Sequence, residues 1–408
     1  MLPGDVAGII KSNFSVPEFR VEIVDTVSSL GRVLGCDIIS GEDVPGFDRS
    51  TVDGYAVLAS DTFGCSEGTQ AVLTLAGEVL MGESASFALK PGTCVAVSTG
   101  GCIPRGADAV VMIEFTEDYS SGTGDSSGNR DNKLIGIQKP AAPGNNLIFK
   151  GDDVSAGDKI LSAGTVLSAH DIGILAALGY DNISVRVKPV VGIISTGDEL
   201  VPVSVVPANG QVRDVNMSLL KAAVVRFNAS VRDFGIIRDD EASIRSVVLS
   251  AIDFCDIVLI SGGSSAGARD MTARIIESEG ELLFHGIAMK PGKPTILGKI
   301  SGKPVFGLPG HPVAAYMVTE LFVRPLIAEY TGMSVKRYTS SATISEAISS
   351  NHGRAEYIAV RLDESGTAHP VRGKSGLIAS LAGVDGYICV ARDCEGIAKG
   401  EEVTVYEF

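Results

Sequence analysis

Two apolar runs in the middle of the chain each end in small residues and a carboxylate. They are PVVGIISTGDEL at residues 189–200 and DIVLISGGSSAGARD at residues 256–270. Each run is of strand length, rich in β-branched residues and free of polar alternation, which is typical of a strand buried in a parallel sheet. Ligands of such sheets bind beyond the carboxyl ends of the strands. The glycines, hydroxyls and acids at both ends therefore predict a site for an anionic ligand.

The second run is followed by the more specific loop. SGGSSAG, residues 261–267, holds three glycines and three hydroxyls, and such a loop can present several backbone N–H groups to a phosphate. It is neither GxGxxG nor a P-loop with a lysine after its last glycine, so neither a dinucleotide-binding Rossmann fold nor a Walker-type NTPase is supported. Asp198 in TGDEL could by itself be a capping residue. Two such junctions in one predicted sheet favour a ligand site.

Two lysines flank a Pro-Gly turn in MKPGKP, residues 289–294. Surface lysines are usually solvated, but on a rigid turn between buried segments Lys290 and Lys293 predict a fixed clamp for oxyanions. The next motif, FGLPGHP, indicates a strand, a tight turn and a helix that begins at Pro312. Free N–H groups at that helix start add positive potential. His311 has a structural interpretation as well, because a single histidine is more often a hydrogen-bonded structural residue than a catalyst.

A dense polar cluster, FDRSTVDGYAV at residues 47–57, stands in the N-terminal half. Its carboxylates, Asp48 and Asp53, and the arginine between them suit a divalent cation and a polyanion. The structural alternative is a turn with a local Asp–Arg pair. Thr99 lies in STGG after another predicted strand and is a further candidate.

Two more acids, Asp153 and Asp171, have simple structural interpretations. Asp171 follows Ser168 in the S-x-x-D pattern of a predicted helix over 168–179, which Gly179 ends. Asp153 lies in the turn-rich segment KGDDVSAGD. From spacing alone, both are capping or turn residues.

The composition describes a well-packed protein with a net negative charge. Of 408 residues, 45% are hydrophobic, and 34 Lys and Arg oppose 49 Asp and Glu for a net charge of −15. This argues against sequence-tolerant nucleic-acid binding, which needs a basic surface, so an anionic ligand needs a locally positive site. The seven cysteines form no CxxC pair, which predicts a reducing cytoplasm and no zinc ribbon. Neither a signal peptide nor a membrane span is expected.

The order of predicted elements divides the chain. Residues 17–35 carry apolar positions at helical spacing and predict a helix. Between 36 and 144, short strands such as QAVLTLAG, TCVAVSTG and DAVVMIEF predict a small β domain. Its polar Gly/Ser-rich segment 116–133 predicts an exposed loop between two strands.

From 186 to 331 strands and helices alternate, which implies a parallel sheet with right-handed crossovers. The strands are predicted near 189–195, 231–237, 256–261, 295–299 and 304–308, and the helices near 216–227, 241–253, 270–279 and 312–331. Short strands resume after 333 and predict a compact C-terminal β domain.

Five motifs stand in order along the chain: DRSTVDGYA, STGDEL, SGGSSAGARD, AMKPGKP and GLPGHP. This series closely resembles the molybdopterin molybdotransferases of the MoeA family, which are related to the C-terminal part of gephyrin. The resemblance runs from about residue 15 to the C-terminus. It implies a multidomain α/β protein with a MogA/MoaB-like molybdopterin-binding domain at 186–332. A discontinuous linking domain at 1–35 and 145–185, an inserted β domain at 36–144 and a C-terminal β-barrel domain at 333–408 are expected beside it.

The resemblance also implies an activity: Mg²⁺-dependent insertion of molybdate or tungstate into adenylylated molybdopterin, with release of AMP. Expected catalytic residues are Asp48, Asp53, Thr99, Asp153, Asp171, Asp198 and Asp270. Expected substrate-binding residues are Ser50, Thr196, Gly197, Glu199, Ser261, Gly262, Gly263, Ser265, Gly267, Lys290, Lys293, Pro309 and Gly310. Asp198 and Asp270 are expected to hold the metal, because two anionic substrates need Mg²⁺ and fixed cations to meet. The family is dimeric with an intersubunit cleft, so Asp48 is expected to act in trans.

Three positions depart from the family pattern without removing a charged or chelating group: Val52, Ser264 and His311, the last standing where Asn is usual. Replacing His311 with Asn is expected to change the oxyanion affinity by less than tenfold. Two alternatives stay open, a MogA-type molybdopterin adenylyltransferase and a non-enzymatic scaffold on the same fold. The choice between molybdate and tungstate, and the entry of Arg354, Glu356 and Ser375 into the cleft, are open as well.

Overall fold

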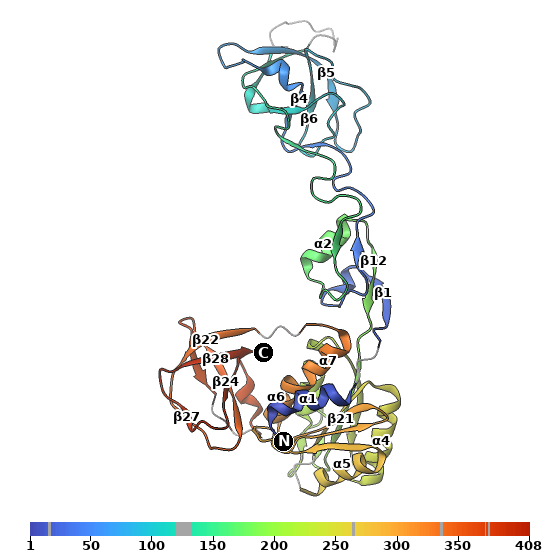
Figure 1. Ribbon diagram of the computed structural model, residues 1–408, viewed down its shortest axis with the longest axis vertical. Coiled ribbons are helices and arrows are strands. Elements are labelled where there is room, and N and C mark those ends of the chain that lie inside the picture. The colour runs from blue at the N-terminus through green and yellow to red at the C-terminus, as the bar shows by residue number, and fades with distance from the viewer. Residues whose placement is uncertain (15–17, 120–132, 263–265, 335–337, 372, 374–375) are drawn as a thin grey trace. The chain divides into compact units, whose positions relative to one another are not determined.

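The computed structural model describes residues 1–14, 18–119, 133–262, 266–334, 338–371, 373 and 376–408, with the backbone alone for 266–270 (Figure 1). Contacts divide the chain into two compact units. The first holds residues 1–35, 164–168 and 183–408, and the second holds 36–163 and 169–182. The four-domain division expected from the sequence is finer than these two units and stays a prediction. Within the described ranges, no helix is long and apolar enough to cross a membrane.

A six-stranded sheet forms the centre of the first unit, in the order β16-β13-β17-β21-β20-β18. Its strands are β13 (Val190–Thr196), β16 (Ser230–Ile237), β17 (Ile257–Gly262), β18 (Glu281–His285), β20 (Ile296–Ile300) and β21 (Lys303–Leu308). The predicted strands are therefore confirmed, and β18 is an additional one. The pairings from β16 to β21 are parallel, as expected.

The expectation of a wholly parallel sheet is wrong at one edge, where β20 pairs antiparallel with both of its neighbours, β21 and β18. The reason lies in the turn between β20 and β21. Ser301 and Gly302 both have positive φ, 50° and 78°, as in the two-residue turn of a β-hairpin. So short a connection can join only antiparallel strands, because a parallel pair needs a long crossover.

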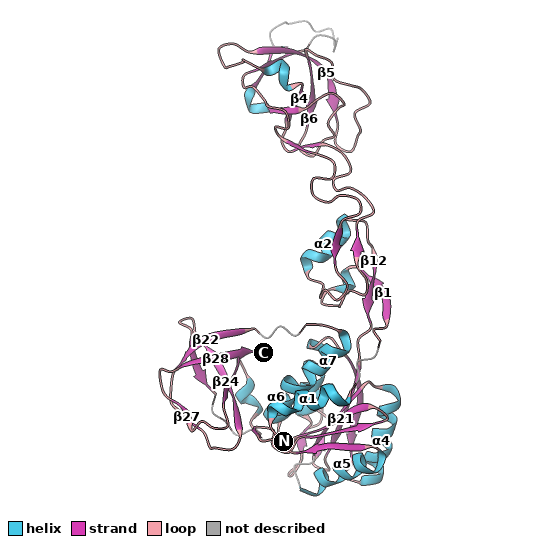
Figure 2. Cartoon of the chain, viewed as in Figure 1, coloured by secondary structure: helices cyan, strands magenta, loops and turns pink. Residues whose placement is uncertain are grey.

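Helices cover both faces of this sheet, as Figure 2 shows. They are α1 (Pro3–Asn13), α3 (Val215–Arg226), α4 (Glu241–Phe254), α5 (Ala266–Glu279), α6 (Pro312–Val318) and α7 (Arg324–Thr331), with a π-helical turn at Thr319–Val323. Ile193 of β13 packs with residues of α1, α3, α6 and α7, whereas its neighbour Ile194 packs with residues of α4 and α5. Burial of both faces explains why the strands are continuously apolar.

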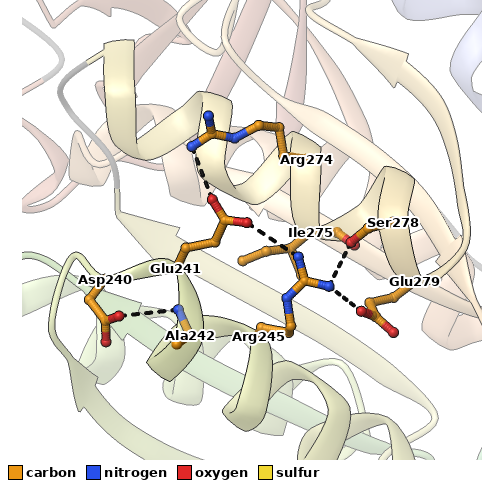
Figure 3. Close-up of polar contacts among 8 residues, drawn as sticks. All are labelled: Asp240, Glu241, Ala242, Arg245, Arg274, Ile275, Ser278 and Glu279. Atoms are coloured by element: carbon orange, nitrogen blue, oxygen red, sulfur yellow. Dashed lines mark hydrogen bonds and ion pairs between the residues drawn. The ribbon is translucent and has the colours of Figure 1, made fainter.

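An ion-pair network fastens α4 to α5 on one face (Figure 3). Arg245 of α4 contacts Glu279 of α5, donates to the Ser278 hydroxyl at 2.8 Å, and pairs with Glu241 on its own helix at 3.2 Å. Arg274 of α5 completes the network at 3.1 Å from Glu241. Helix α5 follows β17, whose carboxyl end carries predicted site residues, so the network ties this helix to α4, which follows β16.

The helix expected at 17–35 is wrong. The segment forms strand β1 (Val21–Asp25), which pairs with β12 (Asn182–Arg186), and a short 3-10 turn at Val27–Ser29. Val27 is 73% exposed, so the apolar spacing does not mark a buried stripe. The β-branched residues of the segment favour an extended strand once a distant partner strand is available.

The C-terminal part of the first unit is a closed five-stranded barrel, which confirms the expected barrel. Its strands are β22 (Thr339–Ile344), β24 (Ala355–Leu362), β25 (Thr367–Pro370), β26 (Gly386–Val390) and β28 (Glu402–Glu407). They pair in the order β24-β25-β22-β28-β26, and β26 pairs back to β24. Strand β19 (Met289–Lys290) leaves the α/β part and pairs with β24 in parallel. An aromatic cluster of Tyr316, Tyr357, Tyr387, Tyr406 and Phe408 lies between the two parts.

The second unit is built on another six-stranded sheet, in the order β7-β4-β6-β5-β9-β8. Its strands are β4 (Gly54–Val57), β5 (Ala71–Val79), β6 (Thr93–Val97), β7 (Ala109–Met112), β8 (Thr116–Asp118) and β9 (Leu134–Ile137). The three strands named in the sequence are confirmed as β5, β6 and β7. Most of the expected exposed loop, at 120–132, lies outside the described residues. The helix predicted at 168–179 is confirmed as α2 (Ala169–Ala177).

Smaller two-stranded pairings complete both units. They join β2 (Ile38–Ile39) to β11 (Lys159–Leu161), β3 (Arg49–Ser50) to β10 (Leu147–Ile148), β14 (Leu200–Val201) to β15 (Val212–Arg213), and β23 (Ile348–Ser349) to β27 (Gly396–Ile397).

Candidate functional site

The carboxyl ends of β13, β17 and β21 lie side by side and form what we call the carboxyl edge, residues 195–199, 261–262 and 309–310. Ser195 is the register partner of Ser261, and Thr196 that of Gly262. Ser261 also pairs with Leu308, the residue before Pro309. The structure thus brings together three of the motifs that the sequence singled out.

Gly262 is needed for this close approach. A Cβ atom added there would lie 2.1 Å from Thr196 Oγ1 and 2.2 Å from the Thr196 carbonyl oxygen. Its φ of 155° is also unfavourable for other residues. The glycine therefore lets the ends of β13 and β17 meet without a side chain between them. Gly263 and Ser265 lie outside the described residues, and Gly267 and Asp270 are described by the backbone of α5 alone.

Asn216 at the start of α3 contacts the carboxyl edge, and the sequence analysis missed this residue. Its Nδ2 donates to the Ser261 hydroxyl at 2.8 Å and to the Gly310 carbonyl at 2.9 Å. The side chain is buried, and Oδ1 has no hydrogen-bond partner among the described residues. Asp214, the N-cap of α3, accepts from the Met217 N–H at 3.0 Å and fixes the helix start. The D-x-N pattern of residues 214–216, which precedes an amphipathic segment, could have indicated Asn216 in the sequence.

Three carboxylates lie at the β13 end of this edge: the exposed Asp198 and Glu199, and the half-buried Asp239, which follows β16. The Asp239 N–H donates to Asp198 Oδ1 at 3.4 Å. Burial, followed by the charges of Glu199 and Asp198, raises the pKa of Asp239, while a hydrogen bond from Thr196 lowers it. Asp239 Oδ1 is buried and has no partner within the described part of the chain. This end of the edge is therefore acidic.

A cavity of about 820 Å³ lies next to the carboxyl edge, between the α/β part and the barrel. Its α/β wall includes Lys290, Lys293, Pro309, His311 and Val313, and its barrel wall includes Ser349, Arg354, Glu356, Tyr357 and Pro370. Pro309 and His311 line it on either side of Gly310, whose carbonyl is held by Asn216. The turn at 309–311 therefore belongs to both the edge and the cavity.

Among the described residues that line this cavity, three lysine or arginine side chains are cationic and one side chain is a carboxylate. Lys290 Nζ lies 2.6 Å from Glu356 Oε1. No ion pair is formed by Lys293 or Arg354 with any residue that the structure describes, and both are exposed. Arg354 and Glu356 thus enter the cavity wall, which the sequence left open, while Ser375 lies outside the described residues. The walls carry a net positive charge that suits an anion.

His311 is the N-cap residue of α6, with Pro312 at the first helical position as expected. The histidine is exposed at the cavity, and its ring lies close to the backbone at Gly376: a Cβ added to that glycine would be 3.8 Å from His311 Nε2. It therefore lies where the turn at 309–311 meets the barrel.

In the second unit, the loops of the first and STGG motifs meet. Asp53 Oδ1 accepts from the Thr99 N–H at 2.7 Å and from its hydroxyl at 3.0 Å. Asp48 Oδ1 accepts instead from the Lys150 N–H at 2.8 Å. The buried Ser50 donates from Oγ to the Val52 carbonyl at 2.6 Å. Asp53 and Thr99 are thus brought together, whereas Asp48 anchors a different loop.

The remaining predicted acids of this unit lie apart from that loop pair in the sequence. Asp153 is exposed, and its N–H donates to the Val44 carbonyl at 3.1 Å. Asp171 lies in the first turn of α2, as predicted. Since the predicted site residues divide between two separately described units, a single site that contains all of them stays a prediction.

The carboxyl edge offers carboxylate oxygens as possible metal ligands. Among the described side chains, no group of three or more His, Cys, Asp or Glu is arranged to hold a metal ion. Mg²⁺ does not need such a group, because it usually binds one or two carboxylates together with substrate phosphates and water. The exposed Asp198 and the Asp239 oxygen that has no partner among the described residues fit this kind of donor set.

Comparisons with known proteins agree along the chain. Residues 6–179 match the family model "MoeA N-terminal region (domain I and II)", 192–329 match "Probable molybdopterin binding domain", and 341–408 match "MoeA C-terminal region (domain IV)". A protein of Methanocaldococcus jannaschii named for molybdopterin biosynthesis is 32% identical over 398 residues, 95% of this chain and 92% of that protein. A molybdopterin molybdenumtransferase of Haemophilus influenzae is 34% identical over 313 residues, 77% of this chain and 74% of that enzyme.

The solved structure of a molybdopterin biosynthesis MoeA protein from Pyrococcus horikoshii OT3 is similar over the full length of both chains, with a TM-score of 0.84 and 33% identity. The expected multidomain α/β fold is thereby confirmed. Because family models match in order from residue 6 to the C-terminus, and a relative above 30% identity spans nearly all of the sequence, this chain belongs to the MoeA family.

Proposed function

We propose that the chain is a molybdopterin molybdenumtransferase in molybdenum cofactor biosynthesis, a transferase that inserts molybdate or tungstate into adenylylated molybdopterin and releases AMP. One observation carries this proposal: an acidic strand edge and a cationic cavity share the turn at residues 309–311. A reaction between a phosphorylated pterin and an oxyanion needs both environments, one for a metal and one for the incoming anion. The names of the relatives support the same assignment.

At the carboxyl edge, the glycines and hydroxyls are suited to the phosphates of the pterin substrate. Gly262 keeps the space beside Thr196 free of a side chain, and backbone N–H groups at such strand ends bind phosphate well. Asp198 and Asp270 would hold Mg²⁺, with Asp239 beside Asp198 as a further oxygen donor. When bound, Mg²⁺ would neutralise phosphate charge and favour the departure of AMP.

In the cavity, Lys290, Lys293 and Arg354 would bind the oxyanion. Each brings an N–H donor that matches a tetrahedral dianion, and together they outnumber Glu356, the one carboxylate among the described lining residues. Fixed cations of this kind let two anions approach each other, because they are in place before the reaction begins.

We also propose a cytoplasmic homodimer in which the second unit of one subunit supplies Asp48, Asp53 and Thr99 to the carboxyl edge of its partner. The family resemblance supports this arrangement. It is tested by mixing D53N and D198N proteins under conditions that exchange subunits. A shared intersubunit site predicts recovery of up to about a quarter of the wild-type activity, because random exchange leaves one intact site in the mixed dimers, which make up about half of the population.

The proposed function is tested by AMP release from purified adenylylated molybdopterin under anaerobic conditions, with Mg²⁺ and with or without molybdate and tungstate. Release that depends on the oxyanion supports the proposal and identifies the preferred metal. The matched variants are D198N, which should remove Mg²⁺-dependent activity, and D253N, an exposed aspartate of α4 outside the site. Formation of adenylylated pterin from ATP without oxyanion-dependent release would assign the earlier adenylyltransferase step instead. An absence of both activities, with capture of a protein partner, would favour the scaffold.

A further inference from the structure

Among the described residues that line the cavity, Glu356 is the one carboxylate. It lies on β24 opposite Lys290 of β19 in the parallel register. One carboxylate oxygen is 2.6 Å from Lys290 Nζ, and the other accepts from the Ser350 hydroxyl at 2.9 Å. The Glu356 side chain is 14% exposed, whereas that of Lys290 is 57% exposed. A fixed, mostly buried carboxylate therefore holds a lysine that faces the cavity.

Apolar packing also holds the barrel against the α/β part. Tyr387 of the barrel is 3% exposed and belongs to the same hydrophobic cluster as the buried residues of β13, α3 and α6. Its ring lies 5.3 Å from that of Tyr406 and 5.6 Å from that of Phe408. The cluster that contains Tyr387 thus helps to join the two parts, so a further use of Glu356 can be considered.

That use concerns the flexibility of lysine. A lysine side chain carries a compact charge on a flexible four-carbon stem, so an exposed ammonium samples many positions unless a partner holds it. Lys293 forms no ion pair with any residue in the described ranges. Lys290 is thus the cavity cation that an ion pair holds, whereas Lys293 and Arg354 form no ion pair with a described residue and can move toward a ligand.

We propose that Glu356 is a positioning residue: it holds the Lys290 ammonium at the cavity wall in the place where the oxyanion binds, and Ser350 in turn fixes Glu356. This inference rests on the proposed function of the same site. It makes a counter-intuitive prediction. A carboxylate in an anion site repels the anion, so on charge alone its removal should tighten binding. If its main effect is to position Lys290, its removal should weaken binding.

The first test detects the Lys290–Glu356 ion pair by a measurement that does not depend on enzyme activity. Purified wild-type and E356Q proteins are labelled briefly with an amine-reactive ester, and labelling of each lysine is followed by mass spectrometry of peptides. Lys290 should label at least about threefold faster in E356Q, because its amine must leave a carboxylate partner in the wild type, while Lys293 should be unchanged. E281Q is the matched control, since Glu281 pairs with Lys299 at 2.9 Å away from the cavity. Equal labelling of Lys290 in wild type and E356Q would overturn the positioning role.

The second test measures AMP release for E356Q, K290A, the double variant and E281Q. Positioning predicts that E356Q raises the KM for molybdate about tenfold with kcat nearly unchanged, and that the double variant is no worse than K290A, because the two residues act as one unit. E356D, which keeps the charge but shortens the reach, should recover only part of the effect. A lower KM in E356Q, or additive losses in the double variant, would overturn the proposal. If the wild type releases no AMP, the proposed function fails, and the labelling result still decides whether Glu356 holds Lys290.

Discussion

The carboxyl edge and the cavity are adjacent regions of the first unit, yet they are built in different ways. The edge consists of strand ends and short loops, and its close contacts, such as Gly262 against Thr196, are set by backbone register. The cavity is assembled from a turn of the α/β part and a strand of the barrel, joined by the pairing of β19 with β24. The edge carries carboxylates and the cavity carries cations. A short motif can thus specify a backbone-built site, whereas a site made of side chains from two parts depends on how those parts pack.

The largest effect, and so the strictest test of this comparison, is expected from a substitution at the carboxyl edge. Gly262→Ala should lower the free energy of unfolding by about 4 kcal/mol, because overpacking against Thr196 adds to an unfavourable backbone conformation. Urea unfolding followed by circular dichroism measures it. Gly8→Ala in α1 is the control, since a Cβ there meets nothing within 4 Å. A loss below about 1 kcal/mol would show that the strand ends can separate, and that the edge is not set by backbone register.

The cavity should respond instead to a change in packing that removes no charge. Tyr387→Ala removes a buried ring from the aromatic cluster and should cost about 3 kcal/mol. Binding of molybdate, measured by calorimetry, should be lost, while Mg²⁺-dependent thermal stabilisation, attributed to the edge, should persist. Tyr338→Ala, at a tyrosine that is 66% exposed, is the control. Loss of both responses together would mean that the two regions are not separable.

A smaller effect is expected where the edge meets the cavity turn. Asn216→Ala removes two hydrogen bonds and leaves the Gly310 carbonyl and the Ser261 hydroxyl without this donor. The expected cost is about 2 kcal/mol, measured by the shift in urea midpoint. The exposed Asn351, changed to Ala, provides the comparison. If Asn216→Ala is no more destabilising than Asn351→Ala, the turn at 309–311 is held by other contacts.

The smallest effect concerns the charge of the edge. Because burial and neighbouring carboxylates raise the pKa of Asp239, the folded state binds its proton more tightly than the unfolded state. Asp239 therefore costs stability at pH 7, and this cost disappears as the pH falls through its raised pKa. Asp239→Asn should stabilise the metal-free protein at pH 7 by about 0.3 kcal/mol after solvent screening, and not at pH 4.

Thermal unfolding at the two pH values measures the effect of this substitution, with Asp253→Asn as the exposed control. Destabilisation at pH 7 in the absence of metal would contradict an acidic, uncompensated edge. It would indicate that Asp239 makes a net favourable hydrogen bond to Thr196 instead.

Much of the fold was predictable where burial and sequence agree. The strands ending in STGD and SGGSS lie in a sheet covered on both faces, so their apolar runs carried a clear signal. The helix expected at 17–35 was wrong. The apolar spacing of this segment is that of a helix, but its β-branched residues form a strand that pairs with a strand near residue 184. Asn216 was missed because an isolated D-x-N pattern is also an ordinary helix start.

The sequence by itself determined the chemistry of the strand ends: glycines, hydroxyls and acids follow apolar strands, and parallel pairing must bring those ends to one edge. It also placed two lysines on one rigid turn. Only the tertiary structure decided which charges meet. The sequence contains many acidic residues with which Lys290 could pair, and the β19–β24 register places Glu356 opposite it. Side-chain pairing across two parts depends on packing that no local pattern encodes.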